Sequence, residues 1–366
     1  DPAIRAALSQ LDYFIARNGT DPTAHFVSAA LHLDMTGVEQ TKVRIEASLH
    51  PVDTVVPGPT AVYFANETAS YGGTDYTLAG RWVVDGANFV RDITALGAVQ
   101  RDWQLVDTGD FNGDLKVDML WQNRATGDVA VWVMDGDNFL HGQTVYTPTA
   151  GEGWKIAGSA DFTGDGRSDI LLATTVVDPS GGLSSTALKL LQVQADGVTL
   201  ESATAIPGAD AGWTVAGAGD FNGDGRADIL WRYSTGLTAV WEMDGSSVLG
   251  GGTVADVSLD WQVANTGDFD GDGRSDILWR NVDGKVAIWE MDGVAVKNSG
   301  TVADPGADWL VAGVADYNGD GRSDILFQHP PTGGDSRTEM QVLTMNGLNV
   351  AAVGNSAYIS NDWQTV

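Results

Sequence analysis

The sequence contains no cysteine, so a disulfide framework and a cysteine nucleophile are both excluded. No apolar run approaches the ~18 residues of a membrane-spanning helix, so we expect no membrane span. Basic residues are scarce: 20 Lys and Arg stand against 49 Asp and Glu, for a formal net charge of −29. Because binding to nucleic acid needs clustered Lys and Arg, this balance argues against a nucleic-acid partner.

Much of the acidic charge lies in five copies of one nine-residue segment. In the copy from Asp220 to Asp228, oxygen-bearing side chains stand at the first, third, fifth and ninth positions, and glycines stand at the fourth and sixth. Hard cations such as Ca²⁺ take six to eight oxygen ligands in a flexible shell. The seventh position would contribute its main-chain carbonyl, which leaves its side chain unconstrained.

We name these five segments the Asp loops, and they span residues 110–118, 161–169, 220–228, 268–276 and 316–324. Each is expected to bind one Ca²⁺, giving about five ions in all. The expected metal-ligating residues, taken from positions one, three, five, seven and nine, are Asp110, Asn112, Asp114, Lys116, Asp118, Asp161, Thr163, Asp165, Arg167, Asp169, Asp220, Asn222, Asp224, Arg226, Asp228, Asp268, Asp270, Asp272, Arg274, Asp276, Asp316, Asn318, Asp320, Arg322 and Asp324.

The Asp loops differ from an EF-hand at position twelve, counted from the first aspartate. An EF-hand closes there with a bidentate Glu. In this chain the position is apolar in every copy, being Trp121, Leu172, Trp231, Trp279 or Phe327. Each loop therefore runs into a short buried strand rather than a helix. Without metal, the three or four carboxylates of each loop would repel one another and oppose folding.

From about residue 58 the sequence repeats with a period close to 50 residues, which indicates a solenoid, a propeller or an array. A tryptophan that opens a short strand recurs six times, as Trp103, Trp154, Trp213, Trp261, Trp309 and Trp363. A tight-turn pair recurs six times, as Asp85-Gly86, Asp135-Gly136, Asp196-Gly197, Asp244-Gly245, Asp292-Gly293 and Asn346-Gly347. Each unit reads as four short strands, the content of one propeller blade.

We therefore predict an all-β fold, a six-bladed β-propeller over residues 58–366. Residues 61–64, 81–84 and from 89 onward supply three strands of the first blade, and the C-terminal strand Trp363–Val366 is expected to complete it and close the ring. Residues 1–57 are expected to form a small accessory segment, with a helix over 1–19, a segment over 25–35 that is ambiguous between helix and strand, and a strand over 43–49. A seven-bladed ring that uses this segment is the alternative.

The Asp loops and the strands after them resemble the FG-GAP/VCBS repeat family, the calcium propellers typified by integrin α subunits. The resemblance is carried by residues 220–231 and 286–293 and covers about 58–366. It implies Ca²⁺ held between the first and second strands of a blade, and extracellular or cell-surface binding more often than catalysis. Leu115 and Thr163 depart from the pattern, so the loops that contain them are expected to bind metal most weakly.

The preferred functional hypothesis is a non-catalytic, calcium-stabilised binding or adhesion module that recognises a glycan or a surface protein. Extracellular Ca²⁺ modules bind at roughly 10⁻⁴–10⁻³ M, so we expect a secreted or cell-surface location. The tryptophans are expected to pack blade against blade rather than to form sugar platforms. The alternative is a polysaccharide lyase or hydrolase, for which the irregular candidates are His141, Tyr146, His329 and Arg337. The ligand and the oligomeric state stay open.

Overall fold

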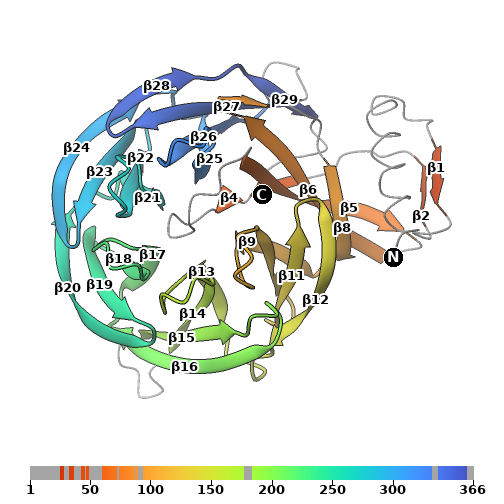
Figure 1. Cartoon of the computed structure of the whole chain (residues 1–366), viewed down its shortest axis with the longest axis horizontal. Coiled ribbons are helices and arrows are strands. Elements are labelled where there is room, and N and C mark those ends of the chain that lie inside the picture. Colours follow the sequence, from red (N-terminus) through yellow and green to blue (C-terminus); the bar gives the residue numbers. More distant parts are fainter. Residues whose placement is uncertain are drawn as a thin grey trace.

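The computed structural model describes residues 25–28, 33–36, 43–45, 47–48, 60–71, 74–85, 87–89, 94–176, 184–331 and 337–360. These residues form a six-bladed β-propeller, in which six sheets are arranged around a central axis (Figure 1). The expectation of six blades is confirmed, and the seven-bladed alternative is wrong. Within the described ranges there is no helix that is long and apolar enough to cross a membrane. The helix expected over residues 1–19 lies outside those ranges.

Blades 2 to 5 are four-stranded antiparallel sheets whose strands follow the chain order. Blade 2 comprises β9 (Trp103–Gly109), β10 (Asp118–Asn123), β11 (Val129–Asp135) and β12 (Asn138–Tyr146). Blade 3 comprises β13 (Lys155–Ala160), β14 (Asp169–Val176), β15 (Ser185–Val193) and β16 (Leu200–Ala209). Blade 4 comprises β17 (Trp213–Gly219), β18 (Asp228–Tyr233), β19 (Leu237–Asp244) and β20 (Ser247–Asp256). Blade 5 comprises β21 (Trp261–Gly267), β22 (Asp276–Asn281), β23 (Val286–Asp292) and β24 (Ala295–Ala303).

The first and last blades differ from the others in their outermost strand, which is in two pieces. Blade 1 contains β5 (Thr60–Tyr71), β6 (Thr74–Asp85), β7 (Asn88–Phe89) and β8 (Thr94–Gln100), and both β7 and β8 pair with β6. Blade 6 contains β25 (Leu310–Ala315), β26 (Asp324–His329), β27 (Arg337–Asn346), β28 (Asn349–Val353) and β29 (Ala357–Ser360). There, both β28 and β29 pair with β27.

Two short strands lie where the last blade meets the first. β3 (Val43–Ile45) pairs antiparallel with β5, and β4 (Ala47–Ser48) pairs parallel with β25 and also contacts β9. Figure 1 shows β4 near the centre of the ring. The sequence predicts one strand over 43–49, whereas the structure has two short strands there, which pair with different blades. The C-terminal strand Trp363–Val366 lies outside the described residues. The boundary at residue 57 stays a prediction.

A separate hairpin precedes these strands. It is made of β1 (His25–Ser28) and β2 (Leu33–Thr36), which pair antiparallel. The segment that the sequence left ambiguous between helix and strand is therefore a strand in both of its described parts.

The apolar core lies between successive blades, because each strand alternates its side chains between the two faces of its sheet. The tryptophan in the second strand of blades 2, 4 and 5 is about 1% exposed in each case: Trp121, Trp231 and Trp279. Each packs against a half-buried tryptophan of the third strand of the same blade, with ring centroids 5.0 Å, 4.8 Å and 5.1 Å apart. For these three residues the expectation of core packing is confirmed, and such aromatic pairs add to the area that they bury.

In blades 2 to 6, the carbonyl oxygen of the tryptophan at or next to the start of the first strand accepts a hydrogen bond from the preceding blade. Arg232 donates to Trp261 at 3.2 Å, and the Nε of Arg280 donates to Trp309 at 3.0 Å. Shorter side chains do the same elsewhere: Thr77 donates to Trp103 at 3.1 Å, Gln122 to Trp154 at 3.2 Å and Thr186 to Trp213 at 2.6 Å. A polar side chain of one blade therefore fixes the position of the next at each of these five junctions.

Candidate metal centre

The five Asp loops occupy equivalent places, each between the first and second strands of its blade. They connect β9 to β10, β13 to β14, β17 to β18, β21 to β22 and β25 to β26. The structure thus places every expected metal-ligating residue at the same end of blades 2 to 6, as the repeat predicts.

The first aspartate of each loop folds the loop around its own carboxylate. In blade 4, Oδ1 of Asp220 accepts the N–H of Gly223 at 2.6 Å and that of Asp224 at 3.1 Å, and Oδ2 accepts the N–H of Gly225 at 2.8 Å. Both glycines have φ near +80°, a conformation that costs other residues strain. The glycines are thus required by the turn, and the turn leaves the loop's oxygen atoms close together.

The ninth residue ties the loop to the rest of its blade. The carboxylate of Asp228 is fully buried; its Oδ2 accepts the N–H of Phe221 at 3.0 Å, and its Oδ1 accepts the N–H of Met243 in β19 at 2.9 Å. Burial above all, together with the charges of Asp220 and Asp224, raises the pKa of Asp228 to about 7, although the two backbone hydrogen bonds act to lower it. The ninth aspartates of the other loops share this burial, with the pKa raised to about 8 in Asp118, Asp169 and Asp276 and to about 7 in Asp324.

One loop brings three carboxylates together in the way a metal ion requires. Oxygen atoms of Asp268, Asp270 and Asp276 all lie within 4.8 Å of one another. Carboxylate oxygens are the donors that hard divalent cations prefer, and a cation beside a buried carboxylate keeps it ionised. This cluster could therefore hold a metal ion.

A lysine lies at the edge of the same cluster. The Nζ of Lys297, in β24, is 3.2 Å from an oxygen of Asp270 and also bonds to Asp272. These contacts raise the pKa of Lys297. A metal ion bound by Asp270 or Asp272 would compete with this ammonium group for the same oxygens.

The two loops that depart from the repeat keep its geometry. Leu115 stands where the other loops have their second glycine, and its φ is +61°, the one positive φ of a non-glycine residue in the described part of the chain. Thr163 stands at the third position of its loop, with its hydroxyl 3.4 Å from Asp161. The weaker metal binding expected for these two loops stays a prediction.

Hydrogen bonds also run from each of the last four Asp loops to the loop of the preceding blade, which the sequence analysis missed. The N–H at position eight donates to the main-chain carbonyl at position one of the preceding loop. The pairs are Ser168 to Asp110 at 2.7 Å, Ala227 to Asp161 at 2.7 Å, Ser275 to Asp220 at 2.6 Å and Ser323 to Asp268 at 2.6 Å. The loops of blades 2 to 6 are thus linked in series.

The carbonyl at position two of three loops is used in the same way. It accepts the N–H of the turn glycine in the next blade, from Gly245 to Phe162 at 2.8 Å, from Gly293 to Phe221 at 2.7 Å and from Gly347 to Phe269 at 2.8 Å. The side chains of these phenylalanines are fully buried in the core between the two blades. Two successive carbonyls and one aromatic ring of a loop therefore all contact the following blade.

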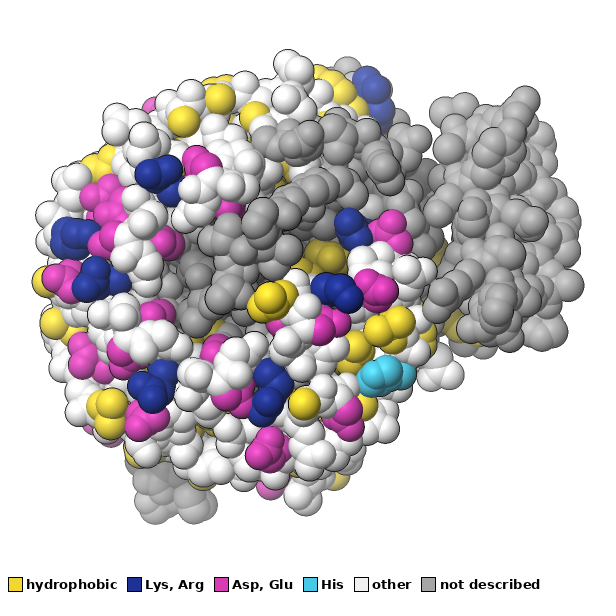
Figure 2. Space-filling view, viewed as in Figure 1, with side chains coloured by type: hydrophobic (Ala, Val, Ile, Leu, Met, Phe, Trp, Pro, Cys, Tyr) yellow, Lys and Arg dark blue, Asp and Glu magenta, His cyan; other side chains and the backbone are white. Residues whose placement is uncertain are grey.

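The side chain at position seven is not unconstrained, which corrects the sequence analysis. A Cβ added at Gly164 would lie 3.2 Å from Cγ of Arg226, so the arginine packs directly over the fourth position of the preceding loop. The same contact joins Arg274 to Gly223. The Nε of Arg226 is 3.3 Å from Asp244, in the turn of its own blade. Figure 2 shows basic side chains beside acidic ones around the ring. The missed signal was the recurrence of Arg or Lys at position seven.

The candidate catalytic residues of the alternative hypothesis do not form one cluster. Tyr146 lies in β12 and bonds to Lys189 at 2.5 Å, whereas His329 packs on Trp309 with ring centroids 5.0 Å apart in blade 6. His141 lies on the outer strand of blade 2, and Arg337 begins the third strand of blade 6.

Two family models match the repeats of this chain. The FG-GAP-like repeat model matches residues 88–172 and 268–327, and the FG-GAP repeat model matches residues 211–243. All five Asp loops fall within these matches. The chain is an FG-GAP repeat protein.

Comparisons with individual proteins add little to this FG-GAP assignment. No curated protein matches the sequence. Among solved structures, the FG-GAP chain is similar to Chaetomium thermophilum Raptor at 10% sequence identity and a TM-score of 0.43. The similarity covers 88% of this chain and 25% of Raptor, so the chain spans about a quarter of that protein. We draw no inference from a likeness at this level.

Replacing the aspartate at position nine of a loop should lower the free energy of unfolding in the absence of metal more than replacing the aspartate at position five. Asp228→Ala leaves two buried N–H groups unpaired, so the free energy of unfolding in EDTA should fall by about 2–4 kcal/mol. Asp224 is exposed, and its carboxylate accepts the N–H of Arg226 at 2.9 Å and the side-chain amide of Asn222 at 3.3 Å. Water can replace these bonds, so Asp224→Ala should cost less than about 1 kcal/mol. Urea unfolding measures the free energy of unfolding of both variants. Equal losses would contradict the structural role assigned to the buried aspartate at position nine.

The sixth position offers a test of backbone strain. Leucine in the left-handed backbone conformation costs about 1–2 kcal/mol, and Leu115→Gly removes this strain. Glycine adds an entropic cost of folding of about 0.5–1 kcal/mol. We expect urea unfolding to show no loss of stability, or a gain of up to about 1 kcal/mol. Gly225→Ala is the matched control, because nothing lies within 4 Å of the added Cβ. It should destabilise by about 1 kcal/mol, and a loss from Leu115→Gly of that size would refute the strain.

Proposed function

We propose that this FG-GAP repeat protein is a calcium-stabilised binding or adhesion module that works outside the cell and recognises a glycan or a surface protein. The observation that carries the proposal is the convergence of carboxylate oxygens from Asp268, Asp270 and Asp276 within 4.8 Å. FG-GAP repeats often bind calcium, and an oxygen-only donor set favours Ca²⁺ over a softer metal.

In this proposal Asp268, Asp270, Asp272 and Asp276 hold the ion in blade 5, and the main-chain carbonyl of Arg274 completes the set. The ion supplies positive charge that holds the buried carboxylates in their ionised form. The corresponding residues of the other Asp loops are proposed to do the same, for about five ions. Because the loops are linked in series between blades, the ions stabilise the ring rather than bridge a ligand.

Binding is favoured over catalysis for two reasons. The FG-GAP propeller fits a binding or adhesion type of module, and within the described residues His141, Tyr146, His329 and Arg337 lie apart from one another. Sites of the extracellular type bind Ca²⁺ at roughly 10⁻⁴–10⁻³ M, which supports a secreted or cell-surface location, where calcium is plentiful.

Calcium is expected to raise the melting temperature of the protein. With dissociation constants of roughly 10⁻⁴–10⁻³ M, 10 mM Ca²⁺ should contribute about 1.4–2.7 kcal/mol of stability at each occupied site. The melting temperature is measured in EDTA and in CaCl₂ from 0 to 10 mM, with MgCl₂ at matched ionic strength as the control. Asp272→Ala, at the exposed fifth position of one loop, should remove part of the rise and leave the rest. A melting temperature that does not respond to Ca²⁺ would overturn the calcium part of the proposal.

A further inference from the structure

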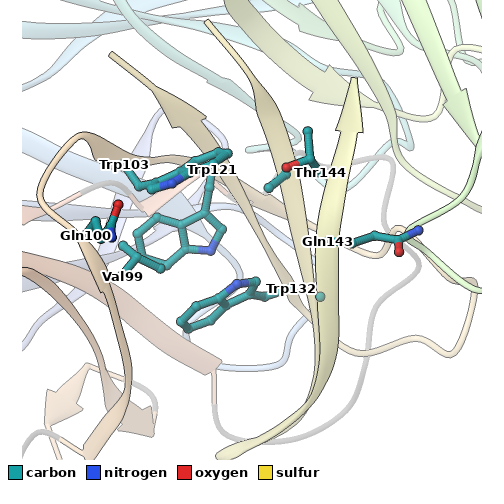
Figure 3. Close-up of a pocket in the computed structure, with 9 residues that line it drawn as sticks. Val99, Gln100, Trp103, Trp121, Trp132, Gln143 and Thr144 are labelled. Carbon is teal, nitrogen blue, oxygen red and sulfur yellow. The ribbon is translucent and has the colours of Figure 1, made fainter. Parts of the chain in front are cut away.

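The cavity between blades 1 and 2 is unsuited to a cation. Trp103, Trp121 and Trp132 form much of its wall (Figure 3), and none of the described residues that line it is charged. A cation that entered it would lose water without gaining a counter-charge, which is unfavourable. Each Asp loop, in contrast, concentrates carboxylates, and the loop of blade 5 has one more of them than any other Asp loop.

The additional carboxylate of blade 5 stands at position three and belongs to Asp270. The other four loops have an uncharged residue at this position, namely Asn112, Thr163, Asn222 and Asn318. Oxygen atoms of Asp268, Asp270 and Asp276 lie within 4.8 Å of one another. The added charge strengthens the attraction for a divalent cation, and it also strengthens the repulsion within the loop when no cation is bound.

The outer strands of blades 2 to 6 each have a β-bulge at the same place. In blade 5, Lys297 is the extra residue of β24, between the residues that pair with Glu290 and Met291 of β23. The corresponding residues are Leu140 in β12, Glu201 in β16, Leu249 in β20 and Ala351 in β28. These strands form the outer rim of the ring (Figure 1). A bulge breaks the regular alternation of a strand, so it can aim one side chain at a neighbouring loop.

The bulge residue contacts the Asp loop of its own blade in both blades where it is charged. In blade 3, Glu201 lies 3.6 Å from the guanidinium of Arg167, at position seven. In blade 5, the Nζ of Lys297 lies 3.2 Å from an oxygen of Asp270 and also bonds to Asp272. In blades 2 and 4 the bulge residue is an exposed leucine, which has no polar group to offer. The lysine therefore brings a positive charge to the loop that has the additional carboxylate.

Lys297 adds to a pairing that several loops share. The position-five aspartate contacts the basic residue at position seven of its own loop in blade 2 at 3.6 Å, in blade 5 at 3.4 Å and in blade 6 at 3.7 Å. That contact does not distinguish blade 5. Lys297 comes from another strand, and it reaches positions three and five, which are both expected to bind calcium. The side chains of Lys297, Asp270 and Asp272 are partly buried, so salt screens their contact less than one on the open surface.

We propose that Lys297 sets the calcium affinity of the blade 5 loop by acting as a tethered competitor for the ion. The inference rests on the proposed function, and it adds a residue that regulates one of the proposed sites. In the absence of calcium, the ammonium group offsets the repulsion between Asp270 and Asp272. Lys297 has to leave these oxygens before Ca²⁺ can occupy them, and its flexible four-carbon side chain allows this movement. Because it is anchored in β24, the displaced ammonium still lies near the ion and opposes binding.

The test is a titration of the full chain with CaCl₂, followed by the amide NMR signals of Gly273 in blade 5 and Gly225 in blade 4. Each of these N–H groups donates to the position-one carboxylate of its own loop, at 2.9 Å and 2.8 Å, so each signal reports on one site. Lys297→Met keeps the apolar part of the side chain and removes the charge. It should lower the dissociation constant measured at Gly273 about tenfold and leave that at Gly225 unchanged within about twofold.

Three further variants control for charge and position. Lys285→Met removes a lysine that bonds to Asp283 in the turn between β22 and β23, at the opposite end of the same blade. It should change neither dissociation constant by more than about twofold. Lys297→Arg keeps the charge and should not reproduce the gain in affinity. Leu249→Lys places an ammonium group at the bulge of blade 4 and should weaken the site that Gly225 reports by about threefold or more.

The melting temperature separates competition from a purely structural role of Lys297. In EDTA, Lys297→Met should melt about 1–2 °C below the original chain, because the repulsion among the carboxylates of the loop is offset less. Between EDTA and 10 mM CaCl₂, the melting temperature of the variant should rise by more than that of the original chain, because its site binds calcium more tightly. A lysine that only held the strand in place would lower the melting temperature equally in both conditions.

Two results would overturn the inference: an unchanged dissociation constant at Gly273 in Lys297→Met, or a tenfold fall that Lys285→Met reproduces. In either case calcium binding by the loops, and with it the proposed function, stands. If Gly225 and Gly273 do not respond to calcium in the original chain, the calcium part of the proposed function fails and the inference fails with it. Should Lys297→Met not fold, Leu249→Lys decides, because unchanged binding at Gly225 also overturns the inference.

Discussion

The structure depends on one repeated hydrogen bond, from the main-chain N–H at position eight of an Asp loop to the carbonyl at position one of the loop before it. Most of the contact between blades is made by apolar side chains, which are not directional, and the bonds to the leading tryptophans come from side chains that differ from one junction to the next. A short N–H to carbonyl bond, 2.6 Å between Ser275 and Asp220, fixes the register of one blade on the next. Because position one also folds its own loop around its carboxylate, the shape of each loop and the placement of the following blade are determined by the same residue.

This arrangement explains why several carboxylate groups lie close together in each Asp loop. Asp220 and Asp228 both accept main-chain N–H groups, and Asp228 does so while fully buried. Burial of a carboxylate is unfavourable, and its raised pKa reflects that cost. A bound cation would offset the cost and leave the hydrogen bonds in place. Calcium binding and blade-to-blade order are therefore two aspects of one proposed device.

The repeat itself could be read from the sequence because its signals are local. Loop spacing, leading tryptophans and turn pairs predict the blades, their number and the burial of Trp231 and Trp279. What the sequence did not reveal depends on contacts between blades. The packing of Arg226 over Gly164 joins residues that are 62 positions apart in the chain, and the pairing of β4 with β25 joins the two ends of the ring.

The most direct measurement is amide hydrogen exchange at position eight of the loops, with and without calcium. The account predicts that the N–H groups of Ala227, Ser275 and Ser323 are strongly protected in 5 mM CaCl₂. In EDTA their protection should fall more than that of amides in the middle of the same blades, such as Leu230 in β18. Equal protection in both conditions, or rapid exchange of these three amides in calcium, would contradict the claim that the Asp loops hold the ring together.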